Sequence, residues 1–362
     1  MSDVLPVLAE VRNRVGHLTL NRPAGLNALN LEMVRLLRQH LEAWEKDRKV
    51  CAVMIRGAGE KAFCAGGDIR SLYDSFKTGG DLHEVFFVEE YALDLYLHEY
   101  AKPVVALMDG FTLGGGMGLA QAATLRIVTE RARLGMPETG IGYFPDVGGS
   151  YCLPRLPGQL GYYLGVTGVH IQAADALYAG LADWYMDSAH IGELDRRLDA
   201  FPWTHSPLQD LSALLAELSF KQLGGSQLAD LRPAIDQYFG LPNLDAILAS
   251  LHEESRPPYQ AWAQATLQTM ARHSPLAMSV TLELLRRGKQ LSLADCFALE
   301  LHLDRQWFES GDLVEGVRAL LVDKDKTPRW SPPSLRELST ERVQRFFAGF
   351  QASATHQEPC HA

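Results

Sequence analysis

The sequence has 362 residues, of which 47% are hydrophobic and 22% are charged, an ordinary composition for a globular protein long enough for two domains. Its formal net charge of −10 excludes the basic character that binding to a nucleic-acid backbone or an anionic membrane requires. Five widely spaced cysteines without a CxxC pair indicate reduced thiols. We recognise no signal peptide, transit segment or membrane-spanning run, and we therefore expect a cytoplasmic protein.

Strand-like and helix-like segments alternate through residues 1–203. Period-2 or continuous apolar patterns predict strands, and apolar residues at 3.6-residue spacing predict helices. In chain order the expected elements are a strand at 15–21, a helix at 31–47, a strand at 51–57, a helix at 82–100, a strand at 102–110, a short helix that opens in the glycines 114–116, and a strand at 124–130. The recurring order of strand, glycine turn and helix predicts an α/β fold around a buried sheet.

The alternation of strand-like and helix-like segments ends at about residue 204. From there to residue 345 the apolar residues recur at helical spacing, with Gly and Pro between the segments, which predicts an α-helical C-terminal region. The last residues, 346–362, have the composition of a disordered tail.

Two glycine-rich turns are candidates for binding a ligand through the backbone. The first lies in "FCAGGDIR" at 63–70, after a predicted strand, and the second in "GFTLGGGMGLA" at 110–120, between a strand and a helix. Glycine lets peptide N–H groups face a ligand, and two such turns that converge would form an oxyanion hole. Each turn alone is more commonly a simple tight turn. Neither turn matches a nucleotide-binding motif.

Two acidic residues, Glu138 and Asp146, stand eight positions apart in "MPETGIGYFPDVGGSYCLPRL" at 136–156. Each follows a proline, and Pro-Glu and Pro-Asp pairs are ordinary in turns, so the two residues taken alone would be loop acids. Ser150 lacks the closing glycine of a nucleophile elbow, and we interpret it as a helix N-cap. The histidines are scattered singly, so we expect no metal site.

The motifs "EKAFCAGGDIR", "GFTLGGGMGLA" and "MPETGIGYFPDVGGSYCLPRLPG", in this order and spacing, resemble the crotonase (enoyl-CoA hydratase/isomerase) superfamily, and within it the 3-hydroxyisobutyryl-CoA hydrolase branch. The resemblance spans residues 10–200 and resumes at 274–288 and 315–338. It implies a crotonase-type spiral of ββα units with an α-helical C-terminal region. It also implies that the carbonyl oxygen of a CoA thioester binds between the N–H groups of Gly67 and Gly115.

The resemblance separates the branches of the superfamily at three positions. Hydratases carry a first catalytic glutamate where this chain has Gly118 and a second where it has Glu138, whereas Asp146 stands where hydratases usually have glycine. "FPDVGG" is the signature of the hydrolase branch, so Glu138 and Asp146 are the implied catalytic pair. Glu138 would attack the thioester carbonyl or activate the attacking water, and the sequence leaves both routes open. Asp146 would hold the 3-hydroxyl of the substrate or the water.

The surroundings of the two acids suggest different charge states. Glu138 lies among apolar residues that would raise its pKa by desolvation, while Asp146 precedes an expected helix start whose N–H groups favour an ionised carboxylate. A third acid contacts substrate in the branch pattern, and the match selects Glu90, the second glutamate of "EEY" at 89–91. Helical spacing alone does not choose, because Glu89 has nearly as apolar a face.

The resemblance further implies that CoA lies along residues 24–30 and 66–70. Leu26 and Ala28 would contact it, and Lys61 or Arg70 would lie near its phosphates. Both basic residues could equally be solvated surface charges.

Together these features imply an enzyme that hydrolyses a short 3-hydroxyacyl-CoA, above all 3-hydroxyisobutyryl-CoA, in valine degradation, with no cofactor apart from the CoA of the substrate. Two alternatives are an enoyl-CoA hydratase or isomerase, against which Gly118 counts, and a catalytically silent acyl-CoA-binding or scaffold protein of the same fold. Retention of both acids and both glycine turns counts against the second. Superfamily members often form trimers or hexamers, so a homo-oligomer is a further possibility.

Overall fold

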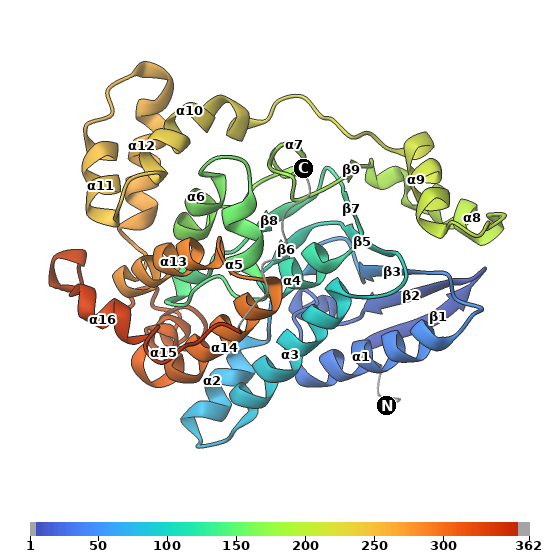
Figure 1. The fold of residues 1–362 in the computed structure, drawn as a ribbon, viewed down its shortest axis with the longest axis horizontal. Coiled ribbons are helices and arrows are strands. Elements are labelled where there is room, and N and C mark those ends of the chain that lie inside the picture. The colour runs from blue at the N-terminus through green and yellow to red at the C-terminus, as the bar shows by residue number, and fades with distance from the viewer. Residues whose placement is uncertain (1–4, 354–362) are drawn as a thin grey trace.

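Within residues 5–353, the larger of two sheets holds six strands in the order β1-β2-β3-β5-β7-β9 (Figure 1). β1 (Val7–Arg12) pairs antiparallel with β2 (Val15–Leu20), and every further pair is parallel. The other members are β3 (Ala52–Gly57), β5 (Val104–Met108), β7 (Leu125–Val128) and β9 (Trp184–Tyr185). The computed structural model describes residues 5–353 of the chain. The strands expected from apolar pattern at 15–21, 51–57, 102–110 and 124–130 are all present, with shorter ends.

A second sheet contains three short parallel strands, β4 (Ala62–Cys64), β6 (Phe111–Leu113) and β8 (Arg133–Gly135). Each follows a strand of the large sheet, in the pairs β3–β4, β5–β6 and β7–β8. The chain therefore winds as a spiral that adds one strand to each sheet per turn. This confirms the expected crotonase-type α/β fold.

Helices of the first half lie where the periodicity predicts them. α1 (Leu31–Lys46) starts at Asn30, whose side chain accepts a hydrogen bond from the N–H of Met33, and it buries an apolar face against the core. α3 (Leu82–His98) and α4 (Gly115–Ala122) match the other expected helices. Shorter helices complete this half: α2 (Ile69–Lys77), α5 (Gly149–Cys152), α6 (Leu160–Thr167) and α7 (Ala173–Ala179).

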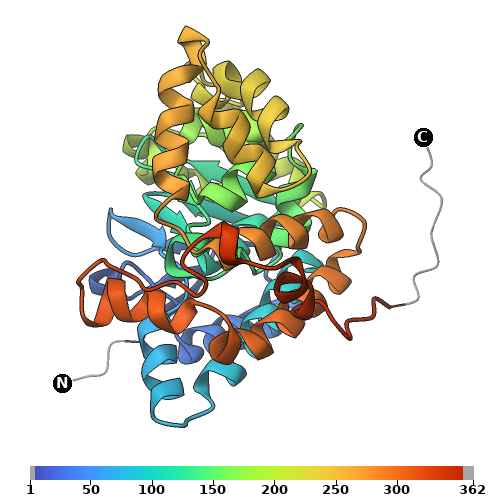
Figure 2. The same ribbon diagram turned by 90° about the vertical axis from the view of Figure 1, so that its left-hand side faces the viewer.

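The C-terminal region is helical, as expected, but it is not a separate layer. α8 (Ile191–Ala200) and α9 (Pro207–Leu218) cover one face of the large sheet and share one apolar cluster with its strands. The predicted boundary at 203/204 lies between these two helices of one apolar cluster, and it stays a prediction. α10 (Gln227–Phe239), α11 (Leu244–His252) and α12 (Pro257–Met270) gather at one end of the molecule, coloured yellow to orange in Figure 2.

The remaining helices bring the end of the chain back to the first half. They are α13 (Pro275–Gly288), α14 (Leu293–Ser310), α15 (Leu313–Val317) and α16 (Thr340–Arg345). α14 packs against α3, and α13 packs against α6. Phe346 and Phe347, the first residues of the expected tail, are buried, and Phe346 lies 4.6 Å from Trp307 between ring centroids. Residues 354–362 of that expected tail lie outside the described residues.

None of the helices within residues 5–353 is long and apolar enough to cross a membrane.

Candidate active site

The three strands of the small sheet lead into one cavity. Because β4, β6 and β8 are parallel, the segments that follow their carboxyl ends lie together. These segments carry Gly67, Gly115 and Glu138, and all three line a cavity of about 120 Å³ together with Glu90 and Asp146. The fold thus brings together all five residues that the motifs single out for catalysis, the oxyanion hole and substrate contact.

The backbones of the two glycine-rich turns approach each other closely. Gly66 has φ +100°, and a Cβ placed on it would lie 3.7 Å from the N atom of Gly115. A Cβ on Gly115 would meet Oε1 of Glu90, so a larger residue there would displace the Glu90 carboxyl. Within residues 5–353, the N–H groups of Gly67 and Gly115 donate to no other part of the protein. Two unpaired N–H groups beside one cavity are the arrangement that an oxyanion hole requires, and their binding of a carbonyl oxygen stays a prediction.

Glu138 opens a short 3-10 helix, Glu138–Ile141, directly after β8. Its side chain is buried, and Oε2 has no hydrogen-bond partner among the described residues. Burial raises the pKa of Glu138 well above its ordinary value, and the nearby charge of Asp146 raises it further. This is the direction expected from its apolar surroundings. An unpaired carboxyl beside two unpaired N–H groups is equipped to act on a bound carbonyl group.

Asp146 is buried on the same cavity, and its Oδ2 accepts a hydrogen bond of 2.6 Å from the hydroxyl of Tyr91. Burial raises the pKa of Asp146 to about 7, although the bond from Tyr91 lowers it. The expectation that helix N–H groups would keep Asp146 ionised is wrong. The N–H groups of Gly148 and Ser150 instead donate to the carboxyl of Glu300, at 2.8 and 2.9 Å.

Ser150 itself is not the N-cap that the sequence suggested. The capping position of α5 is Gly148, with φ +83°, and Ser150 lies inside the helix. Its hydroxyl donates to Oε1 of Glu300 at 2.5 Å.

Glu90, and not Glu89, faces the cavity. Glu90 is only 2% exposed and its Oε1 has no partner among the described residues, whereas Glu89 pairs with Arg35 at the surface, at 2.7 Å. Burial raises the pKa of Glu90 well above its ordinary value, and the charge of Asp94 adds to this. Asp94 lies one helical turn further along α3, fully buried and, within residues 5–353, without a hydrogen-bond partner on either oxygen.

Sequence reasoning missed four polar residues around the site, Tyr91, Tyr143, Glu300 and Asp304. Tyr143 lines the cavity and donates a hydrogen bond of 2.8 Å to Oδ1 of Asp304. Glu300 and Asp304 lie four residues apart on α14, both buried. The sequence could have indicated their burial, because charged residues that share a helix face with leucines are expected to point inward.

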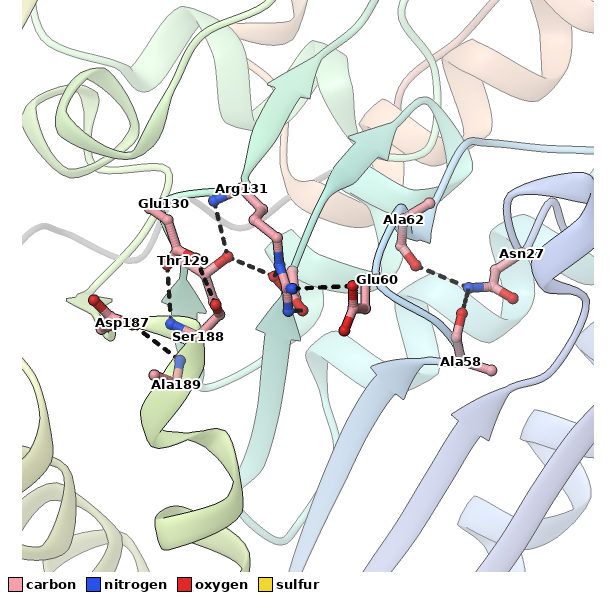
Figure 3. A network of polar contacts seen from close by, with 11 residues as sticks. Asn27, Ala58, Glu60, Ala62, Thr129, Glu130, Arg131, Asp187, Ser188 and Ala189 are labelled. Atoms are coloured by element: carbon pink, nitrogen blue, oxygen red, sulfur yellow. Dashed lines mark hydrogen bonds and ion pairs between the residues drawn. The ribbon is translucent and has the colours of Figure 1, made fainter.

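The segment expected along CoA lies beside the first glycine turn. The N–H of Ala65 donates to the carbonyl of Leu26 at 3.0 Å, and the N–H of Leu29 donates to the carbonyl of Gly66 at 2.8 Å. Asn27, fully buried, donates through its amide to two carbonyls of the β3–β4 turn, those of Ala58 and Ala62 (Figure 3). These bonds hold Leu26 and Ala28 next to the oxyanion turn, and their contact with CoA stays a prediction.

Neither expected phosphate ligand lines the cavity. Arg70 pairs with Asp74 at 2.9 Å and donates to the carbonyl of Leu321 at 3.1 Å. Lys61 is exposed. Their role toward CoA phosphates stays a prediction.

The buried acids predict how stability depends on pH. Burial raises the pKa of Asp146 to about 7 and that of Glu300 to about 8, so the folded protein keeps protons that the unfolded chain has lost. Stability from such groups is complete below the unfolded pKa values, near 4, and is lost as pH rises through the folded values. Buried histidines such as His98, with a pKa lowered to about 4, act in the opposite direction, but only up to about pH 6.5.

We therefore expect the melting temperature to fall between about pH 6.5 and 8, since each extra proton held by the folded state costs about 1.4 kcal/mol of stability per pH unit. Calorimetry across this range measures it. Asp94→Asn should flatten the decline, because burial also raises the pKa of Asp94 well above its ordinary value, and the exposed Asp74→Asn should not. A melting temperature that is constant or rises across the range would contradict this expectation.

Comparisons with known proteins agree with this geometry. Residues 15–347 match the family model described as enoyl-CoA hydratase/isomerase. The chain is similar to a protein of Danio rerio named "3-hydroxyisobutyryl-CoA hydrolase, mitochondrial", at 38% identity over 94% of this chain and 89% of the relative. The human protein of the same name is 36% identical over 96% of this chain and 89% of its own length.

Solved structures are similar over almost the whole chain. A carnitinyl-CoA dehydratase from Mycobacterium thermoresistibile has a TM-score of 0.88 and 38% identity, covering 98% of this chain and 99% of its own. An enoyl-CoA hydratase from Rhodobacter sphaeroides has a TM-score of 0.84 and 35% identity, covering 95% and 97%.

The names of the vertebrate relatives overturn one expectation. They describe mitochondrial proteins, which contradicts the cytoplasmic location expected from the N-terminal residues. The expected superfamily is confirmed, both by the fold and by a family model that covers most of the sequence. The chain belongs to the enoyl-CoA hydratase/isomerase family.

Proposed function

We propose that this protein hydrolyses 3-hydroxyisobutyryl-CoA to 3-hydroxyisobutyrate and CoA. The observation that carries the proposal is the meeting of Glu138, Asp146 and the two glycine turns on one small cavity. Relatives named for this activity, at 36–38% identity over most of the chain, support it.

The site supplies a complete set of groups for thioester hydrolysis. The N–H groups of Gly67 and Gly115 accommodate the carbonyl oxygen and stabilise the negative charge that develops on it. Glu138 either attacks the carbonyl carbon, forming an anhydride that water then cleaves, or takes a proton from an attacking water. Both routes break the C–S bond, and the CoA sulfur takes up a proton. The products are the hydroxy acid and the thiol.

The size of the cavity fits a short acyl group. Its volume of about 120 Å³ is small, which favours a branched four-carbon group over a long chain. Phe86, Phe87 and Leu72 supply apolar contact along the wall, while Glu90 and Asp146 supply polar contact. A 3-hydroxyisobutyryl group presents both an apolar branch and one hydroxyl. It retains the carbon skeleton that valine leaves after decarboxylation, so we assign the reaction to valine degradation.

The surroundings of Gly118 count against hydration of a double bond, which uses two acid–base groups that flank the water. A Cβ at position 118 would lie 2.6 Å from Oδ2 of Asp94 and 2.7 Å from Cβ of Val147. Both neighbours are buried and belong to the packed core, so this chain has no room for the first hydratase glutamate.

The proposal is tested by incubating purified protein with 3-hydroxyisobutyryl-CoA and a thiol reagent. We expect CoA thiol to appear at a rate proportional to enzyme. With crotonyl-CoA, loss of the enoyl absorbance measures hydration, and we expect it to be slower by at least about 10²-fold because one acid–base group is missing. Hydration that outpaces thiol release would favour the hydratase alternative. Binding of both esters without turnover would favour a silent binding protein.

A further inference from the structure

Two tyrosines connect Asp146 to a second buried carboxyl outside the cavity lining. The Tyr91 hydroxyl lies 2.6 Å from Oδ2 of Asp146 and 3.5 Å from the Tyr143 hydroxyl, which in turn lies 2.8 Å from Oδ1 of Asp304. Four oxygen atoms thus form a continuous row from α3, the 136–156 segment and α14. We call these four residues the tyrosine chain. No step of the proposed hydrolysis uses Tyr91, Tyr143 or Asp304.

The number of protons in the tyrosine chain determines the direction in which its hydroxyls point. The row has three oxygen–oxygen links, and the two tyrosine hydroxyls supply two protons. A third proton on either Asp146 or Asp304 completes the row and sets its direction. When this proton is on Asp304, both hydroxyls point toward Asp146. When it is on Asp146, both point toward Asp304. The two arrangements differ only by a shift of each proton along its own link.

The surroundings keep one of the two carboxyls protonated. Among residues 5–353, those that line the cavity include no Lys, Arg or His. The charges with the largest effects on Asp304 are those of Asp146, Arg305 and Glu84, and two of these three are acids. Burial raises the pKa of Asp304 well above its ordinary value, and a nearby ionised Asp146 raises it further. Two buried carboxyls that interact in this way hold one proton between them.

Aromatic packing leaves the tyrosine chain little contact with water outside the cavity, which Asp146 and Tyr143 line. The ring of Tyr143 stacks on Phe144 at 4.3 Å and on Phe87 at 5.9 Å, between ring centroids. Tyr91 and Asp304 are 3% and 4% exposed. A proton that moves between the carboxyls therefore passes through the hydroxyls, because the rings leave little space for solvent.

We propose that Asp146 and Asp304 share one proton through Tyr91 and Tyr143, and that Asp304 holds it at rest and supplies it to Asp146 during hydrolysis. The inference rests on the proposed function. When the C–S bond breaks, the CoA sulfur takes up a proton, and Asp146 is the carboxyl that supplies it. Asp304 gives its proton to Tyr143, Tyr143 gives its own to Tyr91, and Tyr91 gives its own to Asp146. Of the two protons of the attacking water, one then restores the pair and the other leaves with the carboxylate product at neutral pH. Tyr91, Tyr143 and Asp304 are positioning residues, since they act through Asp146.

Kinetics of a double-mutant cycle test the proposal. Tyr143→Phe and Asp304→Asn should each lower kcat about tenfold with KM within about twofold, and the double variant should be no slower, because both changes break one chain. Tyr96→Phe is the matched control, since Tyr96 also lies on α3 but its hydroxyl bonds to Glu45. Additive losses, wild-type rates in either single variant, or a rise in KM without loss of kcat would overturn the proposal. Melting temperatures identify variants that fail to fold.

Infrared titration of the ligand-free protein supplies a test that does not depend on the substrate. The protonated carboxyl band that disappears in Asp304→Asn should be present at neutral pH in the wild type. Its titration midpoint should move up in pH in Tyr143→Phe, because the bond from Tyr143 lowers the pKa of Asp304. If 3-hydroxyisobutyryl-CoA is not hydrolysed but the band behaves in this way, the proposed function fails and the shared proton stands. The shared proton is overturned if the titration midpoint of the band is the same in Tyr143→Phe as in the wild type. It is also overturned if the band is absent from the wild type at neutral pH.

Discussion

Glu138→Gln should lower kcat for thioester hydrolysis by at least about 10²-fold, because an amide is neither a nucleophile nor a base. KM should stay within a few-fold. Gln has nearly the shape of Glu, so the variant leaves the size of the cavity unchanged. Thiol release under saturating substrate measures kcat, and calorimetric titration with a CoA ester measures binding.

Glu89→Gln is the matched control. Glu89 carries the same side chain, but it pairs with Arg35 on the surface of α3 and faces away from the cavity, so its variant should keep wild-type activity. If Glu138→Gln keeps more than a tenth of the wild-type rate, Glu138 has neither of its two proposed roles. Loss of activity in both variants would indicate that the fold, and not the site, had been disturbed.

The elements that the sequence predicted are those long enough to show a period. α1 and α3 repeat an apolar face over four turns or more, and β3 and β5 of the large sheet are nearly continuous apolar runs. β4, β6 and β8 have three residues each, too few for any period, and no strand could be predicted there. These strands nevertheless place the site, because the glycine turns and Glu138 follow their ends. The resemblance, and not the pattern of residues, supplied this part of the fold.

The residues of the site also differ in how far the sequence predicts them. The motif residues were predictable because they sit in short contiguous stretches with distinctive composition. The sequence could indicate that Asp304 points inward, but not that it contacts Tyr143, because this contact joins residues 161 positions apart through the packing of α14 on α3. The charge state expected for Asp146 was wrong for the same reason. Glu300, also on α14, takes the helix N–H groups that the local sequence seemed to offer to Asp146.

The largest effect on specificity should come from Asp146. A pocket with an oxyanion hole and Glu138 could hydrolyse a plain acyl thioester. The two further buried acids that face the cavity, Glu90 and Asp146, are therefore expected to have another role. The bond from Tyr91 occupies Oδ2 of Asp146, which leaves Oδ1 to meet a substrate hydroxyl. An analogue without the hydroxyl would leave this buried carboxyl, and the unpaired Oε1 of Glu90, without a partner. Sites of this kind reject such analogues by about 10⁴-fold, whereas discrimination by size alone reaches about 10²-fold.

We therefore expect kcat/KM for 3-hydroxyisobutyryl-CoA to exceed that for isobutyryl-CoA by about 10⁴-fold, and 3-hydroxypropionyl-CoA to be preferred over isobutyryl-CoA as well. Asp146→Ala should reduce this preference to about 10²-fold or less and should also slow the reaction, because Tyr91 loses its acceptor. Asp146→Asn should keep more of the preference, since an amide still accepts a hydrogen bond from the substrate. Rates of thiol release over a range of concentrations of each ester give the ratios. Equal turnover of isobutyryl-CoA and its hydroxylated counterpart by the wild type would leave Asp146 without a role in recognising the hydroxyl, and the protein would then be a thioesterase that selects its substrate by size.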